Sequence, residues 1–210
     1  DYETFGSYFG SRKACEPVHV QMNLDDHDVV VLNTTTSPLD DMKVTLTCYD
    51  LAGKKISAKT VKEIDVPANS RKDLFRAELD GINGNYIVRL VLSDRKGKVV
   101  TVNDYMMRGE GTEDFKALNS VGKAQIKARK VSSQDGVLRY EITNTTGNIA
   151  FNLKFNLCDE KTGEIILPAY FSDGYFHLLP GEKRVIEVHS PLAGALMVEG
   201  YNVDNTTLKL

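Results

Sequence analysis

The chain has 210 residues, of which 41% are hydrophobic and 26% are charged, and its formal net charge is −3. This composition is typical of a globular protein and excludes a disordered or fibrous chain. Acidic and basic residues are interspersed, which excludes the basic surface that nucleic acid requires, and no apolar run approaches the ~18–20 residues needed to span a bilayer. The length suits two domains of about 100 residues each.

The first 14 residues show no strand pattern. They carry the aromatic residues Tyr2, Phe5, Tyr8 and Phe9, which indicates a segment that packs on something, such as a neighbouring domain absent from this chain. The chain opens on Asp1 rather than Met and shows no signal peptide, so we expect a mature or excised piece of a longer protein.

Short runs of alternating apolar and polar residues follow along the rest of the chain. The clearest runs are residues 42–49, 86–92 and 149–157. Turn sequences such as LAGKK, DRKGK and EKTGE separate them. Strands this short and regularly spaced predict an all-β chain built from β-sandwiches.

The two halves of the chain repeat one pattern. In each half a strand ends in Asn-Thr-Thr, a glycine-centred hairpin follows, and a proline later opens a turn before another strand. These features lie 111, 110 and 113 residues apart, at Asn33 and Asn144, Gly53 and Gly163, Pro67 and Pro180. The sequence therefore predicts one fold used twice. At the offset of 111, Leu46 falls on Leu157, so both should face a core.

The predicted domain boundary follows Met107. Residues 108–114, RGEGTED, are glycine-rich and acidic, which is typical of a linker, and the next eight residues are compatible with one helical turn. We assign residues 1–14 to a leader, 15–107 to the first sandwich, 108–122 to the linker and 123–210 to the second sandwich.

The polar motifs are more typical of turns than of metal-binding or cofactor-binding sites. Residues 25–28, DDHD, offer carboxylate oxygens to a cation, but aspartate between two strands is also ordinary turn chemistry, which we favour. The histidines and cysteines have no metal-binding spacing and no disulfide framework: His19, His27, His177, His189, Cys15, Cys48 and Cys158. We predict no metal and no cofactor.

Three Asn-Thr-Thr triplets, at Asn33, Asn144 and Asn205, match the glycosylation sequon. Two of them end equivalent strands of the repeat, so turn formation explains them without glycans. The sequence shows no Gly-x-Ser-x-Gly elbow. A glycosidase needs two carboxylates about 5–9 Å apart, and sequence alone cannot select a pair among 29 acidic residues.

An aromatic run before Pro180 has no counterpart in the first half. It supplies Tyr170, Phe171, Tyr175 and Phe176 as candidate sugar-contact or domain-packing residues. The absence of tryptophan counts against a sugar platform, and we expect Tyr175 and Phe176 mainly to pack, either at one edge of the sandwich or on an absent domain.

Three stretches carry a family resemblance: GSYFGSRKACEPVHVQ at 6–21, TVNDYMM at 101–107 and SDGYFHLLPGE at 172–182. They resemble the C-terminal part of glycoside hydrolase family 2 enzymes of the β-mannosidase and exo-β-D-glucosaminidase branch. Met106 stands where that family has Trp, and Gly174 where it has Asn. The matching positions are Tyr8, Phe9, Gly10, Arg12, Ala14, Glu16, Pro17, His19, Gln21, Asn103 and Tyr105.

The resemblance implies two tandem immunoglobulin-like domains that follow a catalytic barrel in a larger retaining exo-glycosidase, which would act on terminal β-glucosaminides or β-mannosides. The family's acid/base glutamate lies in an Asn-Glu dipeptide, which this sequence lacks, so no catalytic residue is implied here. The implied function is non-catalytic bracing of the barrel. The alternatives are a carbohydrate-binding module that uses the aromatics from Tyr170 to Phe176, and an unrelated adhesion sandwich.

The implied partners are the barrel and, through the parent enzyme, an oligosaccharide, with no nucleic acid and no membrane insertion. The compartment would be periplasmic or secreted if the parent is a bacterial glycan-degrading enzyme. Residues 1–14 would be the chain leaving the barrel. Without the barrel we expect this leader to be loosely held or to dock onto a neighbouring chain, and we expect deletion of residues 1–10 to cost little stability.

Overall fold

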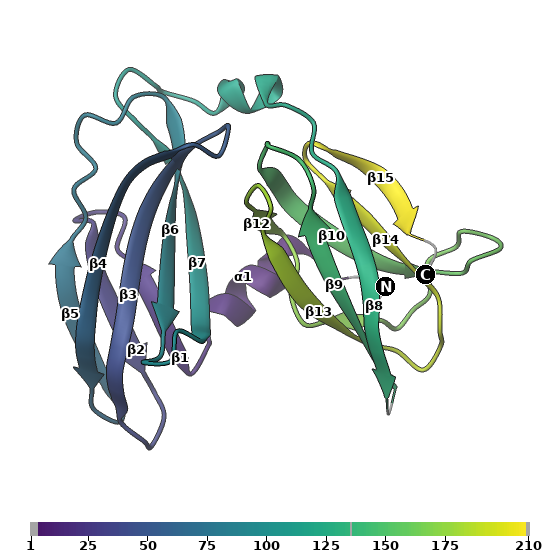
Figure 1. The fold of residues 1–210 in the computed structure, drawn as a ribbon, viewed down its shortest axis with the longest axis horizontal. Coiled ribbons are helices and arrows are strands. Elements are labelled where there is room, and N and C mark those ends of the chain that lie inside the picture. Colours follow the sequence, from purple (N-terminus) through teal and green to yellow (C-terminus); the bar gives the residue numbers. More distant parts are fainter. Residues whose placement is uncertain (1–3, 135, 209–210) are drawn as a thin grey trace. The chain divides into compact units, whose positions relative to one another are not determined.

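The computed structural model describes residues 4–134 and 136–208, and the chain divides into two compact units. One unit is Ser11–Ser120, and the other is Val121–Leu210 together with Asp1–Gly10. Each unit is a sandwich of two antiparallel sheets (Figure 1), which confirms the predicted all-β fold class. Among the described residues, no helix is both long and apolar enough to cross a membrane.

The first sandwich packs a four-stranded sheet, in the order β4-β3-β6-β7, on a three-stranded sheet, β1-β2-β5. Alternate residues of both sheets meet in the core, where Val31, Leu46 and Leu90 are buried. The predicted alternating runs at 42–49 and 86–92 lie within β3 and β6. The strands are β1 Val18–Met22, β2 Asp28–Asn33, β3 Leu39–Asp50, β4 Lys55–Val66, β5 Ser70–Arg76, β6 Asn85–Ser93 and β7 Val99–Arg108.

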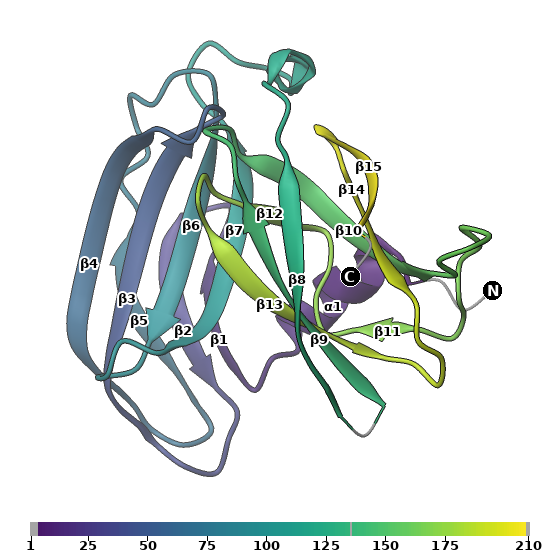
Figure 2. The same ribbon diagram turned by 45° about the vertical axis from the view of Figure 1, so that its right-hand side comes forward.

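The second sandwich packs two four-stranded sheets, β12-β10-β14-β15 and β11-β13-β9-β8. Its core includes Tyr140, Phe155 and Ile186 (Figure 2 shows the strands that carry them). The strands are β8 Ile126–Gln134, β9 Val137–Asn144, β10 Ala150–Cys158, β11 Tyr170–Phe171, β12 Phe176–Leu178, β13 Lys183–His189, β14 Ala195–Gly200 and β15 Val203–Leu208. A short 3-10 helix, Lys116–Ser120, lies before β8.

The internal repeat is visible in the cores. Leu46 on β3 and Leu157 on β10 both lie in the core of their own sandwich, as the offset of 111 predicts. Strands β2 and β9 both end at the asparagine of an Asn-Thr-Thr triplet, Asn33 and Asn144. The same local sequence therefore builds the same strand end twice.

The leader is the part of the fold that the sequence did not predict correctly. Residues Gly6–Ala14 form helix α1, and Phe9 on this helix is 8% exposed within the core of the second sandwich. A buried phenylalanine typically contributes several kcal/mol. The expectation of a loosely held leader is therefore wrong at Phe9, because its ring fills the interior of a domain that begins more than 100 residues later.

Candidate functional site

The aromatic run contributes one strand to each sheet of the second sandwich, β11 with Phe171 and β12 with Phe176. Phe171 is 6% exposed and stacks on Phe155, with ring centroids 6.3 Å apart. Phe176 lies between Phe155, at 5.7 Å, and the guanidinium of Arg184, at 4.0 Å from the ring centre. Arg184 also donates a hydrogen bond of 3.0 Å to Asp173 in the same turn. A cation–π contact and an ion pair thus fix the turn over the core.

The turn from Asp173 to Tyr175 forms a socket for Phe9. Tyr175 has a left-handed backbone, with φ of 58°, and its N–H donates to the Leu153 carbonyl at 2.6 Å. This conformation places the Tyr175 ring 5.9 Å from the Phe9 ring. A Cβ atom at Gly174 would lie 3.0 Å from the Phe9 ring, so glycine allows the helix to approach the turn.

The four candidate aromatics therefore do not share one open surface. Phe171 is buried, while Tyr175 and Phe176 are half-buried and pack against the core. Of the four, Tyr170 alone is exposed, at 48%. A sugar platform needs flat rings open to solvent, and only Tyr170 meets that requirement.

A polar network lies in the first sandwich, where β1 meets β7. His19 is almost fully buried, with its Nδ1 3.4 Å from the Glu16 carboxylate and its Nε2 3.2 Å from the Asn103 amide nitrogen. Asn103 also donates to the Tyr105 hydroxyl at 2.9 Å, and that hydroxyl accepts the Met22 N–H at 2.9 Å. Because the Asn103 nitrogen can only donate, His19 Nε2 is the acceptor, and Nδ1–H points at Glu16.

The charges of this network follow from its surroundings. Burial lowers the pKa of His19 and outweighs the opposing effect of Glu16, so the ring is neutral. Burial alone would raise the pKa of Glu16, but hydrogen bonds from Lys13 and Thr101, together with the Lys13 charge, lower it below its usual value. The Lys13 ammonium donates to Glu16 at 2.7 Å, and the Thr101 hydroxyl donates to Glu16 at 2.5 Å.

The network resembles a carboxylate–histidine dyad, but its geometry is structural. Both nitrogens of His19 contact groups that orient it, Glu16 and Asn103, and neither group is a hydroxyl or thiol that the ring could activate. These residues lie in two separate sequence motifs, and neither motif predicts that the two meet. Residues 84 positions apart give no local signal of contact, although both motifs belonged to the resemblance.

Two equivalent asparagines hold the turns of the repeat. Asn33 is fully buried, and its amide nitrogen donates to the carbonyls of Ser37, at 2.9 Å, and Pro67, at 3.0 Å. Asn144 is also fully buried and donates to Asn148, at 2.7 Å, and Leu178, at 3.0 Å. Each side-chain oxygen accepts from the second threonine that follows: Thr35 for Asn33 and Thr146 for Asn144.

The remaining candidate positions hold ordinary contacts. The Asp25 and Asp26 carboxylates accept backbone N–H groups within their own turn. Over the described residues, no group of three or more His, Cys, Asp or Glu side chains is placed to hold a metal ion. The three cysteines are free, with Cys48 and Cys158 buried and Cys15 exposed.

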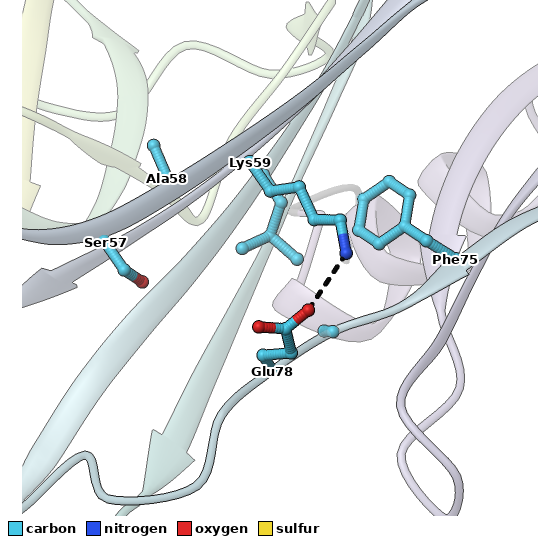
Figure 3. Close-up of a pocket in the computed structure, with 7 residues that line it drawn as sticks. Ser57, Ala58, Lys59, Phe75 and Glu78 are labelled. Carbon is cyan, nitrogen blue, oxygen red and sulfur yellow. Dashed lines mark hydrogen bonds and ion pairs between the residues drawn. The ribbon is translucent and has the colours of Figure 1, made fainter.

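A pocket of about 100 Å³ lies between β4 and β5 of the first sandwich (Figure 3). The Lys59 ammonium extends into it, 4.8 Å from the centre of the Phe75 ring and 3.2 Å from the Glu78 carboxylate. The groups that could attract a ligand already satisfy one another. The Glu78 side chain is 88% exposed, so this ion pair contributes little to stability.

Comparisons with known proteins match both sandwiches. Residues 25–108 match the family described as the mannosidase Ig/CBM-like domain, and residues 104–203 match the exo-β-D-glucosaminidase Ig-fold domain. The exo-β-D-glucosaminidase of Amycolatopsis orientalis is 26% identical over 97% of this chain, and that of Hypocrea virens is 28% identical over 98%. These alignments cover 23% and 26% of the two relatives, so the chain spans about a quarter of their length.

A solved structure has the same fold. The crystal structure of the Amycolatopsis orientalis exo-chitosanase CsxA superposes with a TM-score of 0.85 at 23% sequence identity, over 100% of this chain and 28% of that one. With the two matched domain families, this likeness confirms the immunoglobulin-like fold expected from the resemblance.

Proposed function

Because this chain belongs to the tandem Ig-like domains of the exo-β-D-glucosaminidase and β-mannosidase branch of glycoside hydrolase family 2, we propose that it braces the catalytic domain of a longer glycosidase. In this role the two sandwiches are non-catalytic. The parent would be a retaining exo-enzyme. Since five of the curated relatives are exo-β-D-glucosaminidases, terminal β-D-glucosaminides are the favoured substrates, with β-mannosides second.

The observation that carries this proposal is the seating of Phe9. The segment that would connect to a catalytic domain enters the core of the second sandwich, where it contacts Gly174 and Tyr175. Because this connection is held in the core of the second sandwich, we expect the sandwich to stabilise the catalytic domain attached to it. The Glu16–His19 pair supports the same reading, because both ring nitrogens of His19 are engaged by residues that orient it, Glu16 and Asn103.

The test compares three proteins: the full-length parent, the parent without these 210 residues, and this chain alone. We expect this chain to release no p-nitrophenol from p-nitrophenyl β-D-glucosaminide or β-mannoside. We expect the truncated parent to unfold at a lower temperature and to lose most of its turnover. Hydrolysis by this chain alone, or full activity and stability without it, would contradict the proposal.

The carbohydrate-binding alternative has less support from the geometry. Three of its four rings are committed to contacts within the sandwich, and Tyr170 alone is open. Titration of glucosamine oligomers into the parent and into a Tyr170→Ala variant, followed by calorimetry, distinguishes the two functions. Equal heats would leave Tyr170 without a sugar-binding role. For the compartment, we propose a periplasmic or secreted location, since the relatives are glycan-degrading enzymes.

A further inference from the structure

One outward surface of the second sandwich is apolar where solvent-facing residues are expected. Along the segment that leads into β11, Ile166 packs against the core and Phe171 lies within it. Their neighbours Ile165, Leu167 and Tyr170 instead point outward and are 43%, 39% and 48% exposed. Phe5, at the start of the leader, is 61% exposed. We call Phe5, Ile165, Leu167 and Tyr170 the apolar patch.

The other strands of the sheet that contains β11 show what a solvated face looks like. The outward side chains of β8, β9 and β13 form ion pairs, with Arg139 2.7 Å from Glu187 and Arg129 3.4 Å from Glu141. Charged pairs thus occupy this face, together with two exposed valines, Val131 and Val185. Contiguous exposed apolar side chains mark an interaction surface instead.

The backbone beneath the apolar patch is held in place. Ile165 bridges to Cys158, the Ile166 N–H donates to the Leu157 carbonyl at 2.7 Å, and Tyr170 pairs with His189 on β13. Stacking of Phe171 on Phe155 anchors the same segment from inside. A surface already fixed in shape loses little entropy when a partner covers it.

We propose that the apolar patch is the surface on which the catalytic domain of the parent glycosidase docks. This inference rests on the proposed bracing function and names its contact. Thr4 lines a pocket with Ile165, Leu167 and Phe171, so the leader lies against this surface. The chain that leads from a preceding domain into Thr4 therefore arrives beside the patch.

The charges around the patch indicate the chemistry of the docked surface. The hairpin next to Ile165 exposes Asp159, Glu160 and Glu164 against a single Lys161. A complementary surface would therefore have an apolar centre and a basic rim. The curated relatives are about four times as long as the part that aligns with this chain, so the parent has ample chain to supply it.

The experiment measures access to the patch in the full-length parent. Leu167→Cys is compared with Leu192→Cys, since Leu192 is an apolar residue of the same sandwich that is 57% exposed and lies outside the patch. Native protein is treated with a maleimide, and the labelling rate of each cysteine is followed by peptide mass spectrometry. We expect the cysteine at 167 to react roughly tenfold more slowly than the one at 192, because local opening must precede its labelling.

Equal labelling rates at the two positions would overturn the docking surface and leave the bracing function standing, since that function is tested by turnover and truncation. Slow labelling at 167 that appears only at high protein concentration would assign the patch to a second copy and also overturn the proposal. Protection that requires added glucosamine oligomer would assign it to a sugar, with the same result.

A charged substitution within the patch tests the same contact, because it should disrupt docking and expose the patch. Leu167→Glu places a carboxylate in the patch, whereas Leu192→Glu adds the same charge elsewhere on the sandwich. We expect the first variant alone to restore labelling of a cysteine introduced at Ile165 in the full-length protein. Unchanged slow labelling in both variants would show that another structure covers the site.

Discussion

The two sandwiches share one turn, which a buried asparagine holds, but they differ in their other side-chain contacts. Asn33 and Asn144 make the same set of hydrogen bonds at equivalent strand ends. In the first sandwich, β1 and β7 are joined by the polar network around His19. In the second, an aromatic turn receives Phe9 from the leader. The repeat therefore preserves the hydrogen bonds of the turn. The polar network around His19 belongs to the first sandwich, and the aromatic turn that contacts Phe9 belongs to the second.

The largest expected difference between the sandwiches comes from Phe9→Ala. Loss of this ring should destabilise the second sandwich by about 3 kcal/mol, because it leaves a cavity against Gly174 and Tyr175. Hydrogen exchange of β10 and β13 should rise while that of β3 and β6 stays unchanged. Phe5→Ala is the matched control, since Phe5 is 61% exposed. Equal exchange in both variants would show that Phe9 does not stabilise this domain.

Removal of the shared asparagines should affect the two sandwiches alike. Asn33→Ala and Asn144→Ala each leave two carbonyls without their buried donor, which should cost about 2 kcal/mol in the domain concerned. Chemical denaturation followed by domain-resolved exchange measures both. Thr36→Ala, at an exposed position next to the first turn, should change little. A large loss in one sandwich and none in the other would contradict the equivalence of the turns.

The socket can be tested through Gly174→Ala. The added methyl would lie 3.0 Å from the Phe9 ring, so we expect a cost of about 1 kcal/mol. In a Phe9→Ala background the same substitution should be nearly neutral, because the ring it meets is absent. A double-mutant cycle of unfolding free energies measures this coupling. Additive effects would place the cost of Gly174→Ala elsewhere than in contact with Phe9.

The smallest effect concerns pH and belongs to the first sandwich. Burial keeps the pKa of His19 below its ordinary value of 6.5, so the unfolded chain takes up a proton before the folded one does. The stability contributed by neutral His19 is therefore complete above pH 6.5 and is lost as the pH falls below it. His19→Gln should flatten the decrease in unfolding temperature between pH 7 and 5. An unchanged slope in His19→Gln would mean that another group titrates there.

Local patterns predicted the strands but not the contacts between distant segments. Alternation located β3, β6 and β10, and the offset of the repeat placed Leu46 and Leu157 in their cores, since both signals depend on near neighbours in the chain. Nothing local links Phe9 to Tyr175, because a single aromatic on a short helix carries no partner information. The left-handed backbone of Tyr175 was equally hidden, since this conformation is usually taken by glycine or asparagine.

The buried asparagines also affect the choice of expression host for this protein. In a host that attaches glycans to Asn-x-Thr, Asn33 and Asn144 are acceptors only while the chain is still unfolded, because in the folded domains their amide nitrogens are buried and already hydrogen-bonded. Glycosylation and folding therefore compete for the side-chain amide nitrogens of Asn33 and Asn144. A chain modified at either position cannot rebuild its turn, so the yield of native protein from such a host would be set by the relative speed of folding and glycosylation.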